Sequence, residues 1–188
     1  LLTDNPYLDT RPVPASGRQL FIPDLVGGRL VETPTDITNA VTNFINSGGT
    51  LRSATAFVSG YDFVADGSQL VANRLSSILG TGSVRTLIDS TTPFSPATSW
   101  SKAQLIANAF PTGGPAAIND WNGHYDNTRA LMANGTDLLS TSELTGSHAL
   151  SGGIFFTMGC HAGFQTTDAI IGSPVLDWAQ TMAGTGTS

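Results

Sequence analysis

The chain is 188 residues long and 40% apolar, which is sufficient for one domain with a hydrophobic core. Its net charge is −6, its eight basic residues include a single lysine, and it has no basic run, so nucleic-acid binding and binding to an anionic membrane are disfavoured. Because no apolar run approaches the roughly 18 residues of a membrane span, we also predict no such span.

Cysteine usage and composition bear on the compartment. A single cysteine excludes an internal disulfide framework and leaves the redox environment open. The chain is rich in Gly, Thr, Ser and Asn and only 12% charged, a mixture typical of exported bacterial proteins. We therefore predict a secreted or cell-surface location. Because the first residue is Leu and no signal peptide is visible, we expect a fragment whose remaining parts belong to a longer chain.

The first third of the chain is predicted to hold little sheet. Prolines and polar residues indicate an irregular N-terminal arm over residues 1–20, followed by a short extended segment at 21–30. The next segment, 33–49, has helix signals: Thr33 is a suitable N-cap, Pro34 suits the first helical position, and apolar residues recur at helical spacing.

After this helix, strand and helix patterns alternate. Such alternation predicts right-handed βαβ crossovers and a three-layer α/β fold with a mostly parallel sheet. We expect the domain to span 21–188, and, because four strands make a thin sheet, to be incomplete at its ends. The polar stretch before the last strand is predicted to be a connection. The strands are predicted at 55–60, 83–89, 115–124 and 153–159, and the helices at 68–79, 99–110 and from Ser173 onward.

The last predicted strand ends in the only cysteine. Its apolar run, Ile154 to Met158, is typical of a strand buried on both faces, and it leads through Gly159 into Cys160. Open α/β sheets place their chemistry just beyond the carboxyl ends of such strands. Cys160 is therefore a candidate nucleophile, and the alternative is a small buried apolar residue.

A histidine follows the preceding strand in the same way. If the two strands are neighbours, about 4.8 Å apart, His124 and Cys160 share one site, and imidazole is suited to act as base for a thiol. The alternative is a histidine that is hydrogen-bonded in a loop. We interpret His148 and His161 as structural, and we disfavour a zinc site because Cys160 and His161 are adjacent, unlike the spaced ligands of structural zinc sites. Neither common glycine-rich phosphate-loop motif occurs.

Four segments carry a resemblance to a known family, the gingipain family of cysteine peptidases in the caspase-like clan. The resemblance covers about residues 4–164, and the order of histidine, strand and cysteine is part of it. The segments are "IPDLVGGRLVETPTDI" (22–37), "AFVSGYDF" (56–63), "NGHYDN" (122–127) and "FFTMGCHAG" (155–163).

The resemblance implies a caspase-like fold and hydrolysis of peptide bonds through an acyl-enzyme. By position, Cys160 is the nucleophile and His124 the acid and base. The family places an acidic residue behind its histidine, and Asp62 is the candidate here. The backbone amides of Gly123 and Cys160 are expected to form the oxyanion hole.

The resemblance also bears on the substrate side. Asp66 is expected to line a pocket for a basic side chain, as an acidic residue does in the arginine-specific members. Tyr125 stands where the family has glycine, next to the substrate. We expect either that its side chain narrows the oxyanion hole or that the loop is rebuilt around Gly123. We expect a protein or peptide substrate and no cofactor, and leave a structural calcium ion open. The second hypothesis is a non-catalytic interaction module of a larger bacterial surface protein.

Overall fold

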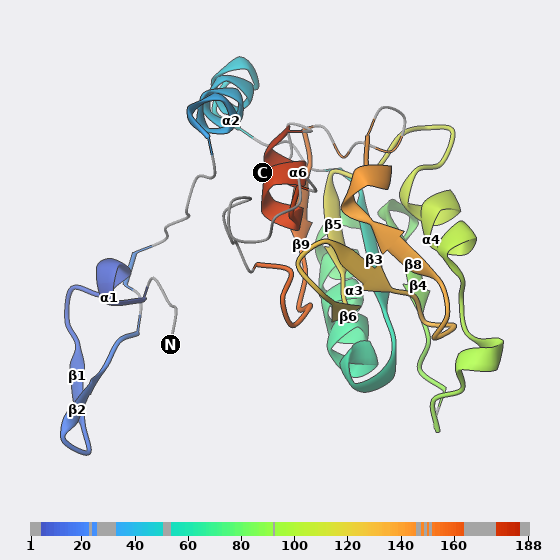
Figure 1. The fold of residues 1–188 in the computed structure, drawn as a ribbon, viewed down its shortest axis with the longest axis horizontal. Helices are drawn as coiled ribbons and strands as arrows, with labels where there is room; N and C mark the ends of the chain where they lie inside the picture. The colour runs from blue at the N-terminus through green and yellow to red at the C-terminus, as the bar shows by residue number, and fades with distance from the viewer. Residues whose placement is uncertain are drawn as a thin grey trace. The chain divides into compact units, whose positions relative to one another are not determined.

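The structure is a computed structural model, shown in Figure 1. It forms two compact units, Leu1–Leu30 and Val31–Ser188, which we describe separately. The residues that the structure describes are 5–22, 24–25, 33–50, 54–91, 93–145, 148, 150, 152–163 and 176–184.

The N-terminal unit contains a hairpin that we did not predict. A short helix, α1 (Asn5–Leu8), precedes the antiparallel strands β1 (Val13–Ala15) and β2 (Arg18–Leu20). Ser16 and Gly17, both with positive φ, form the two-residue turn that such a hairpin requires. The first 20 residues are thus not an irregular arm throughout, and the unit ends at Leu30, ten residues later than expected. The predicted extended segment at 21–30 lies largely outside the described residues.

The second unit contains most of the predicted elements. The 3-10 helices are η1 (Asp62–Val64), η2 (Thr81–Ser83), η3 (Pro96–Thr98) and η4 (Thr141–Glu143). The helices are α2 (Pro34–Asn46), α3 (Ala65–Leu79), α4 (Lys102–Ala109) and α6 (Trp178–Gly184). The strands are β3 (Ala56–Gly60), β4 (Val84–Ile88), β5 (Ile118–Trp121), β6 (His124–Tyr125), β7 (Arg129–Leu131), β8 (Leu138–Ser140) and β9 (Ile154–Phe156).

A four-stranded parallel sheet is the centre of this unit, as predicted. Its strand order is β4-β3-β5-β9, and all three pairings are parallel. Figure 1 shows these strands with helices alongside. On one face a Cβ at Gly60 would overlap Ser68 of α3, while Phe57 on the other face shares a core with Leu105 of α4. The protein is therefore a mixed α/β fold with helices on both faces of the sheet.

Local sequence signals explain where several elements begin and end. Ser101 caps α4 by accepting the amide of Gln104, and the Gln104 side chain accepts the amide of Ser101, which completes a capping box. Helix α3 ends at Gly80, whose φ of 90° suits glycine. Helix α2 follows the predicted 33–49 pattern closely, but its apolar residues remain between 37% and 66% exposed. Ser173, the predicted start of the last helix, lies outside the described residues.

A second sheet, which was not predicted from the sequence, lies beside the parallel sheet. The predicted polar connection forms the antiparallel sheet β6-β7-β8, which packs onto the main core through Ala130 and Leu139. Short strands with few apolar residues gave no clear alternation, so periodicity could not find them. As a consequence β5 ends at Trp121, and His124 opens β6 rather than closing the preceding strand.

The last parallel strand is shorter and more exposed than predicted. Strand β9 stops at Phe156, four residues before Cys160. Phe156 is 57% exposed and Met158 53% exposed, so the run is not buried on both faces. The reason is position: β9 is the end strand of the sheet and pairs with β5 alone among the described strands.

The core is aromatic and centred on Trp121. Its ring makes edge contacts with Phe57, Phe110 and Phe155, with centroid distances of 6.2, 6.1 and 5.3 Å. This packing fixes the end of β5, from which the loop leading to His124 departs. In the described part of the chain, no helix is both long and apolar enough to cross a membrane.

Candidate active site

The three expected catalytic residues each follow the carboxyl end of one strand of the parallel sheet. Ser59 of β3 lies opposite Trp121 of β5, and Asp62 and His124 are each three positions further on. Asp120 of β5 lies opposite Phe156 of β9, and His124 and Cys160 are each four positions further on. Asp62, His124 and Cys160 therefore follow the carboxyl ends of three adjacent strands at matching positions.

Asp62 and His124 are joined by a hydrogen bond. His124 Nε2 lies 3.1 Å from Asp62 Oδ2, and the two side chains are 42% and 38% exposed. A carboxylate only accepts hydrogen bonds, so the Nε2 proton points at Asp62. This leaves Nδ1 as the basic nitrogen of the ring. The predicted placement of an acidic residue behind His124 is thus present in the structure.

The backbone at Asp62 is unusual. Its φ is +56°, a left-handed conformation that aspartate and asparagine tolerate better than most other residues. The conformation turns the chain sharply between β3 and α3, at the first residue of η1. An aspartate here therefore both permits the turn and supplies the carboxylate that meets His124.

Two aromatic rings surround the imidazole. The Tyr61 ring lies 5.7 Å from the His124 ring, and the Phe63 ring lies 5.5 Å from it. The Tyr61 hydroxyl accepts the His124 amide at 3.2 Å and donates to the Leu131 carbonyl at 2.5 Å. Burial raises the pKa of Tyr61, so the hydroxyl keeps its proton. Tyr61 and Phe63 were not among the residues we predicted, although both flank Asp62 within the quoted "AFVSGYDF" motif.

The two amides expected in the oxyanion hole are available. In the part of the chain that the structure describes, neither Gly123 nor Cys160 donates its amide to another group. Gly123 must be glycine, because a Cβ there would overlap the Tyr61 ring. The unpaired amides are consistent with the expected role and do not test it.

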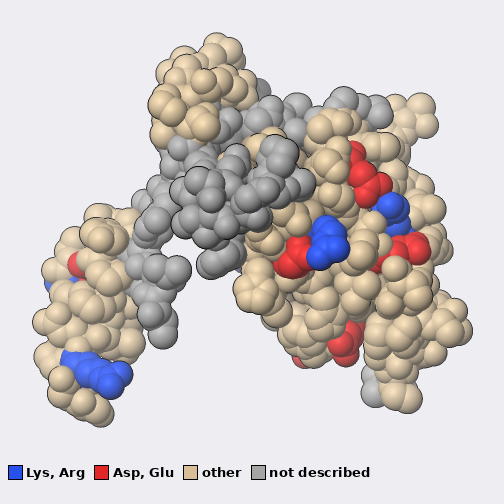
Figure 2. Space-filling model, in the orientation of Figure 1, with Lys and Arg blue, Asp and Glu red and all other residues tan. Residues whose placement is uncertain are grey.

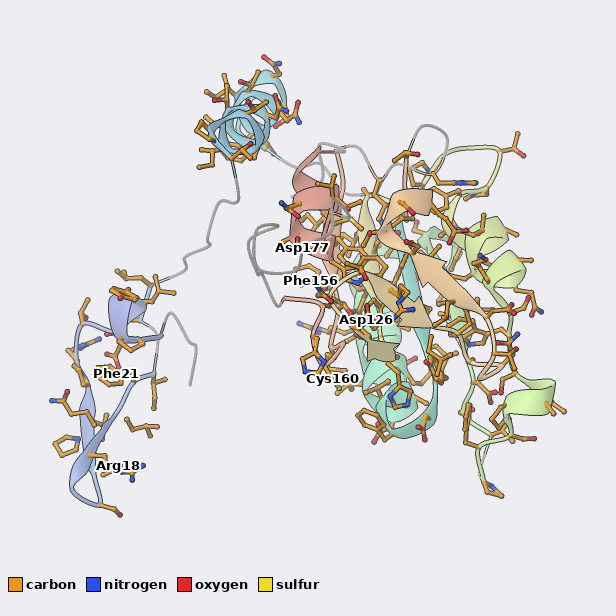
Figure 3. All side chains as sticks on the ribbon, in the orientation of Figure 1. Arg18, Phe21, Asp126, Phe156, Cys160 and Asp177 are labelled. Carbon is orange, nitrogen blue, oxygen red and sulfur yellow. The ribbon has the colours of Figure 1, made fainter. Side chains whose placement is uncertain are left out.

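Cys160 lies in an exposed turn beyond β9, and Figure 3 shows it past Phe156 of that strand. Its neighbour Gly159 is packed against the ring of Tyr125, and a Cβ on Gly159 would overlap that ring. The glycine before the cysteine is therefore required by packing. The alternative that Cys160 is a buried apolar residue is wrong.

One buried amide joins three parts of the site. Asn122, which is 2% exposed, accepts the Met158 amide on Oδ1 at 2.8 Å. Its Nδ2 donates to Ser68 Oγ of α3 at 3.1 Å and to Asp120 Oδ2 at 3.0 Å. Asn122 thus connects the segment before Cys160 with β5 and with the helix after Asp62. Sequence patterns gave no signal for this role, because the partners are 36 or more residues away except for Asp120.

The structure corrects the expected role of Tyr125. Its side chain is 9% exposed and packs against Trp178 at a ring distance of 5.1 Å. Burial raises its pKa, so it remains a neutral phenol. The ring stands in the core beneath Gly159, so it does not project toward the substrate side of the oxyanion hole.

Asp66 is an exposed residue in the first turn of α3, where the helix dipole favours an acidic side chain. Its Oδ1 accepts the amide of Gly67 at 2.7 Å. The carboxylate thus serves the start of the helix, and nothing in this geometry assigns it to a pocket for a basic side chain.

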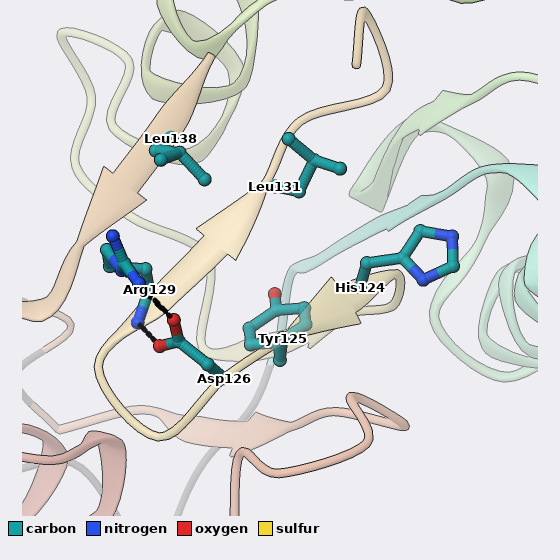
Figure 4. Close-up of a pocket in the computed structure, with 6 residues that line it drawn as sticks. All are labelled: His124, Tyr125, Asp126, Arg129, Leu131 and Leu138. Carbon is teal, nitrogen blue, oxygen red and sulfur yellow. Dashed lines mark hydrogen bonds and ion pairs between the residues drawn. The ribbon is translucent and has the colours of Figure 1, made fainter. Parts of the chain in front are cut away.

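An open pocket of about 240 Å³ is lined by residues of the β6-β7 hairpin and by Leu138 of β8. Figure 4 shows its lining, with the His124 ring turned away from the Asp126–Arg129 pair. Arg129 Nε donates to Asp126 Oδ2 at 3.0 Å. Burial raises the pKa of Asp126, but hydrogen bonds from Thr128 and Arg129 outweigh it and hold that pKa below its usual value. Because the two charges neutralise each other, the pocket carries little net charge.

The two remaining histidines are His148 and His161. His148 packs against Phe110 at a ring distance of 5.2 Å, and His161 is exposed in the turn after Cys160. Among the residues that the structure describes, no group of three or more His, Cys, Asp or Glu side chains is arranged to hold a metal ion.

Comparisons with known proteins identify no relative. No family model matches the chain. Searches of curated proteins and of solved structures find no match either. The resemblance to gingipains therefore rests on the quoted motifs alone.

Proposed function

We propose that the chain carries the active site of a gingipain-like cysteine endopeptidase with a caspase-like fold. The observation that supports this most directly is that Asp62, His124 and Cys160 each follow the carboxyl end of one of three adjacent parallel strands, three or four residues past paired positions. Neighbouring strands are about 4.8 Å apart, a spacing suited to a thiol, an imidazole and a carboxylate that act together.

The first half of the proposed reaction forms the acyl-enzyme. The Cys160 sulfur attacks the carbonyl carbon of the scissile bond, and its proton passes to Nδ1 of His124. The amides of Gly123 and Cys160 donate to the oxyanion that develops on the carbonyl oxygen. His124 then gives the proton to the leaving amine as the C–N bond breaks, which leaves a thioester on Cys160.

The second half releases the product. His124 takes a proton from water, the water oxygen attacks the thioester carbon, and the C–S bond breaks. The sulfur recovers its proton from His124, and the peptide leaves as a carboxylic acid. Throughout, Asp62 keeps the Nε2 proton directed away from Cys160 and stabilises the imidazolium.

Replacement of the nucleophile is the direct test. We expect Cys160→Ala to abolish cleavage of a quenched peptide library and to change the free energy of unfolding by less than about 1 kcal/mol, because the side chain is exposed. Since the chain has one cysteine, alkylation of the parent should abolish cleavage equally. Cleavage by Cys160→Ala at the parental rate would overturn the proposal.

A second variant tests the carboxylate without disturbing the turn. Asn adopts positive φ about as readily as Asp, so Asp62→Asn keeps the backbone and removes the charge. We expect a loss of roughly 10²–10⁴-fold in kcat/KM. Asp137→Asn is the matched control, because Asp137 accepts the Lys102 amide through Oδ2 and asparagine retains an acceptor. It should leave kcat/KM within about twofold.

The competing hypothesis is a non-catalytic interaction module of a larger bacterial surface protein. It requires that a folded chain neither cleaves peptides nor reacts at Cys160 with a thiol-directed peptide inhibitor. Mass spectrometry of the intact chain after inhibitor treatment distinguishes the two, because a peptide adduct on Cys160 contradicts the module hypothesis.

A further inference from the structure

Large apolar side chains border the proposed site on its α3 side. Phe63 is 62% exposed, Leu70 71%, Phe156 57% and Met158 53%. We call these four residues the apolar rim. Isolated exposed apolar residues are common on protein surfaces, but several large ones near one proposed site indicate binding.

Two contacts connect the rim to the site. The Phe63 ring lies 5.5 Å from the His124 ring, and Met158 is two residues before Cys160. A Cβ on Gly67 would lie 3.3 Å from the Met158 Cε, so Met158 rests on α3 between the turns that carry Phe63 and Leu70. The rim therefore begins at the catalytic histidine and continues along α3 and the end of β9.

The backbone of Met158 is fixed by a hydrogen bond, and its side chain lies against α3. The Asn122 side chain accepts its amide at 2.8 Å, and Gly67 has no side chain to displace it. Figure 3 shows Phe156 on the strand that leads to Cys160. Because Phe156 and Met158 are two positions apart, an extended backbone directs both to the same side.

The charges near the rim do not favour a basic ligand. The Asp62 carboxylate is paired with His124, and Asp66 accepts the Gly67 amide while exposed to water. Exposed ion pairs contribute little to affinity, whereas removal of a large apolar side chain from water contributes more. Figure 2 shows charged residues only in small scattered groups on the visible face, with uncharged surface between them.

We infer that the site selects peptides with a bulky apolar or aromatic residue on the amino side of the scissile bond, and that Phe63 is the specificity-determining residue. This inference rests on the proposed function. The occupant of the rim is then the apolar side chain of the substrate. The continuity of Phe63 with His124 supports this choice, because a side chain seated there is next to the bond that Cys160 attacks.

The test compares two quenched peptides that differ only in Phe or Arg before the scissile bond. We expect the parent to cleave the Phe peptide with a kcat/KM at least about tenfold higher. Phe63→Ser should lower kcat/KM for the Phe peptide about tenfold more than it lowers kcat/KM for the Arg peptide. Ile78→Ser is the matched control, because Ile78 is 63% exposed on the same helix, about 12 Å along its axis from Leu70.

A labelling experiment separates failure of this inference from failure of the proposed function. Chloromethyl ketone peptides ending in Phe or Arg are applied to the parent and to Phe63→Ser, and adducts on Cys160 are measured by mass spectrometry. The inference is supported if the Phe reagent labels Cys160 of the parent faster than the Arg reagent does and if Phe63→Ser removes this difference. That outcome supports it even if no peptide is turned over and the peptidase proposal fails.

Equal labelling by both reagents, or a preference for Arg in either assay, overturns the inference and leaves the peptidase intact. The inference is also overturned if the parent forms a dimer and Phe63→Ser dissociates it without changing the labelling preference. In that case a second copy of the chain, rather than a substrate, covers the rim.

Discussion

Asn122 and Met158 are 36 residues apart in the chain, and a 2.8 Å hydrogen bond from the Met158 amide to Asn122 Oδ1 joins them. Through this bond the loop that leads to His124 holds the segment that leads to Cys160. The other hydrogen bonds of the Asn122 side chain reach Ser68 and Asp120, so one side chain connects three segments that surround the proposed active site.

Removal of the Asn122 side chain should lower both the stability of the protein and its turnover. We expect Asn122→Ala to lower the free energy of unfolding by about 2–3 kcal/mol, because Ser68, Asp120 and the Met158 amide lose a buried partner. We also expect turnover to fall roughly tenfold or more, because the position of Cys160 is less defined. Urea unfolding and peptide cleavage measure the two effects.

Asn119→Ala is the control for this prediction. Asn119 is equally buried, but its Nδ2 donates only to the nearby Ala116 carbonyl at 2.7 Å. It should lower stability while the rate of Cys160 alkylation by iodoacetamide stays at the parental value. If both variants change that rate alike, the link between Asn122 and Cys160 is not specific.

Gly159 should not tolerate a side chain. A Cβ at this position would overlap the buried Tyr125 ring, so we expect Gly159→Ala to destabilise the protein by about 1–3 kcal/mol. Gly163→Ala, four residues later, places its Cβ in open space and should change stability by less than about 0.5 kcal/mol. Thermal or urea unfolding of the pair provides the measurement, and equal stability would show that the turn moves away from Tyr125.

The titration of the buried Asp120 carboxyl should affect how the free energy of unfolding depends on pH. Burial raises its pKa above the ordinary value of 3.8, against the lowering effect of the Asn122 hydrogen bond. The native state therefore holds this proton more tightly than the unfolded state. The stabilisation that comes from this tighter proton binding is fully present below pH 3.8. It is lost as the pH rises through the pKa that Asp120 has in the native state.

Asp120→Asn removes this titration and keeps an oxygen that can accept from Asn122. We expect the variant to be more stable than the parent at pH 7 by about 1 kcal/mol and equal to it near pH 3. Asp89→Asn should behave in the opposite way, since hydrogen bonds from Ser99 and Thr91 lower the pKa of Asp89 and its contribution is lost as the pH falls. Parallel stability curves for the parent and Asp120→Asn would contradict the prediction.

The Tyr61 hydroxyl should matter for both stability and turnover. Tyr61→Phe removes the acceptor of the His124 amide and the donor to the Leu131 carbonyl, so we expect a loss of about 1–3 kcal/mol in the free energy of unfolding. Turnover should fall because the backbone of His124 is less restrained. Tyr7→Phe, at an 82% exposed position, is the control and should change neither quantity.

The sequence by itself determined the type and order of the main elements. Strand and helix patterns around β3, α3, β4 and α4 were strong because each has a continuous apolar period and clear punctuation, such as the Ser101 cap. These patterns also predicted a parallel sheet and pointed to His124 and Cys160, whereas Asp62 was named only through the family resemblance. The pairing of Asp62 with His124 also followed from that resemblance, and the hydrogen bond between them is present.

Only the tertiary structure decided how the site is supported and what borders it. The sheet β6-β7-β8 consists of strands of two or three residues, too short for a period to be read. The roles of Asn122, Tyr61 and Tyr125 depend on partners distant in the chain, and a side chain's direction there depends on packing rather than on its neighbours in sequence. Exposure of Phe156 reverses what local pattern predicted, and burial of Tyr125 differs from what the family resemblance implied. In both cases the neighbours that the fold brings to an element decide which of its faces is covered.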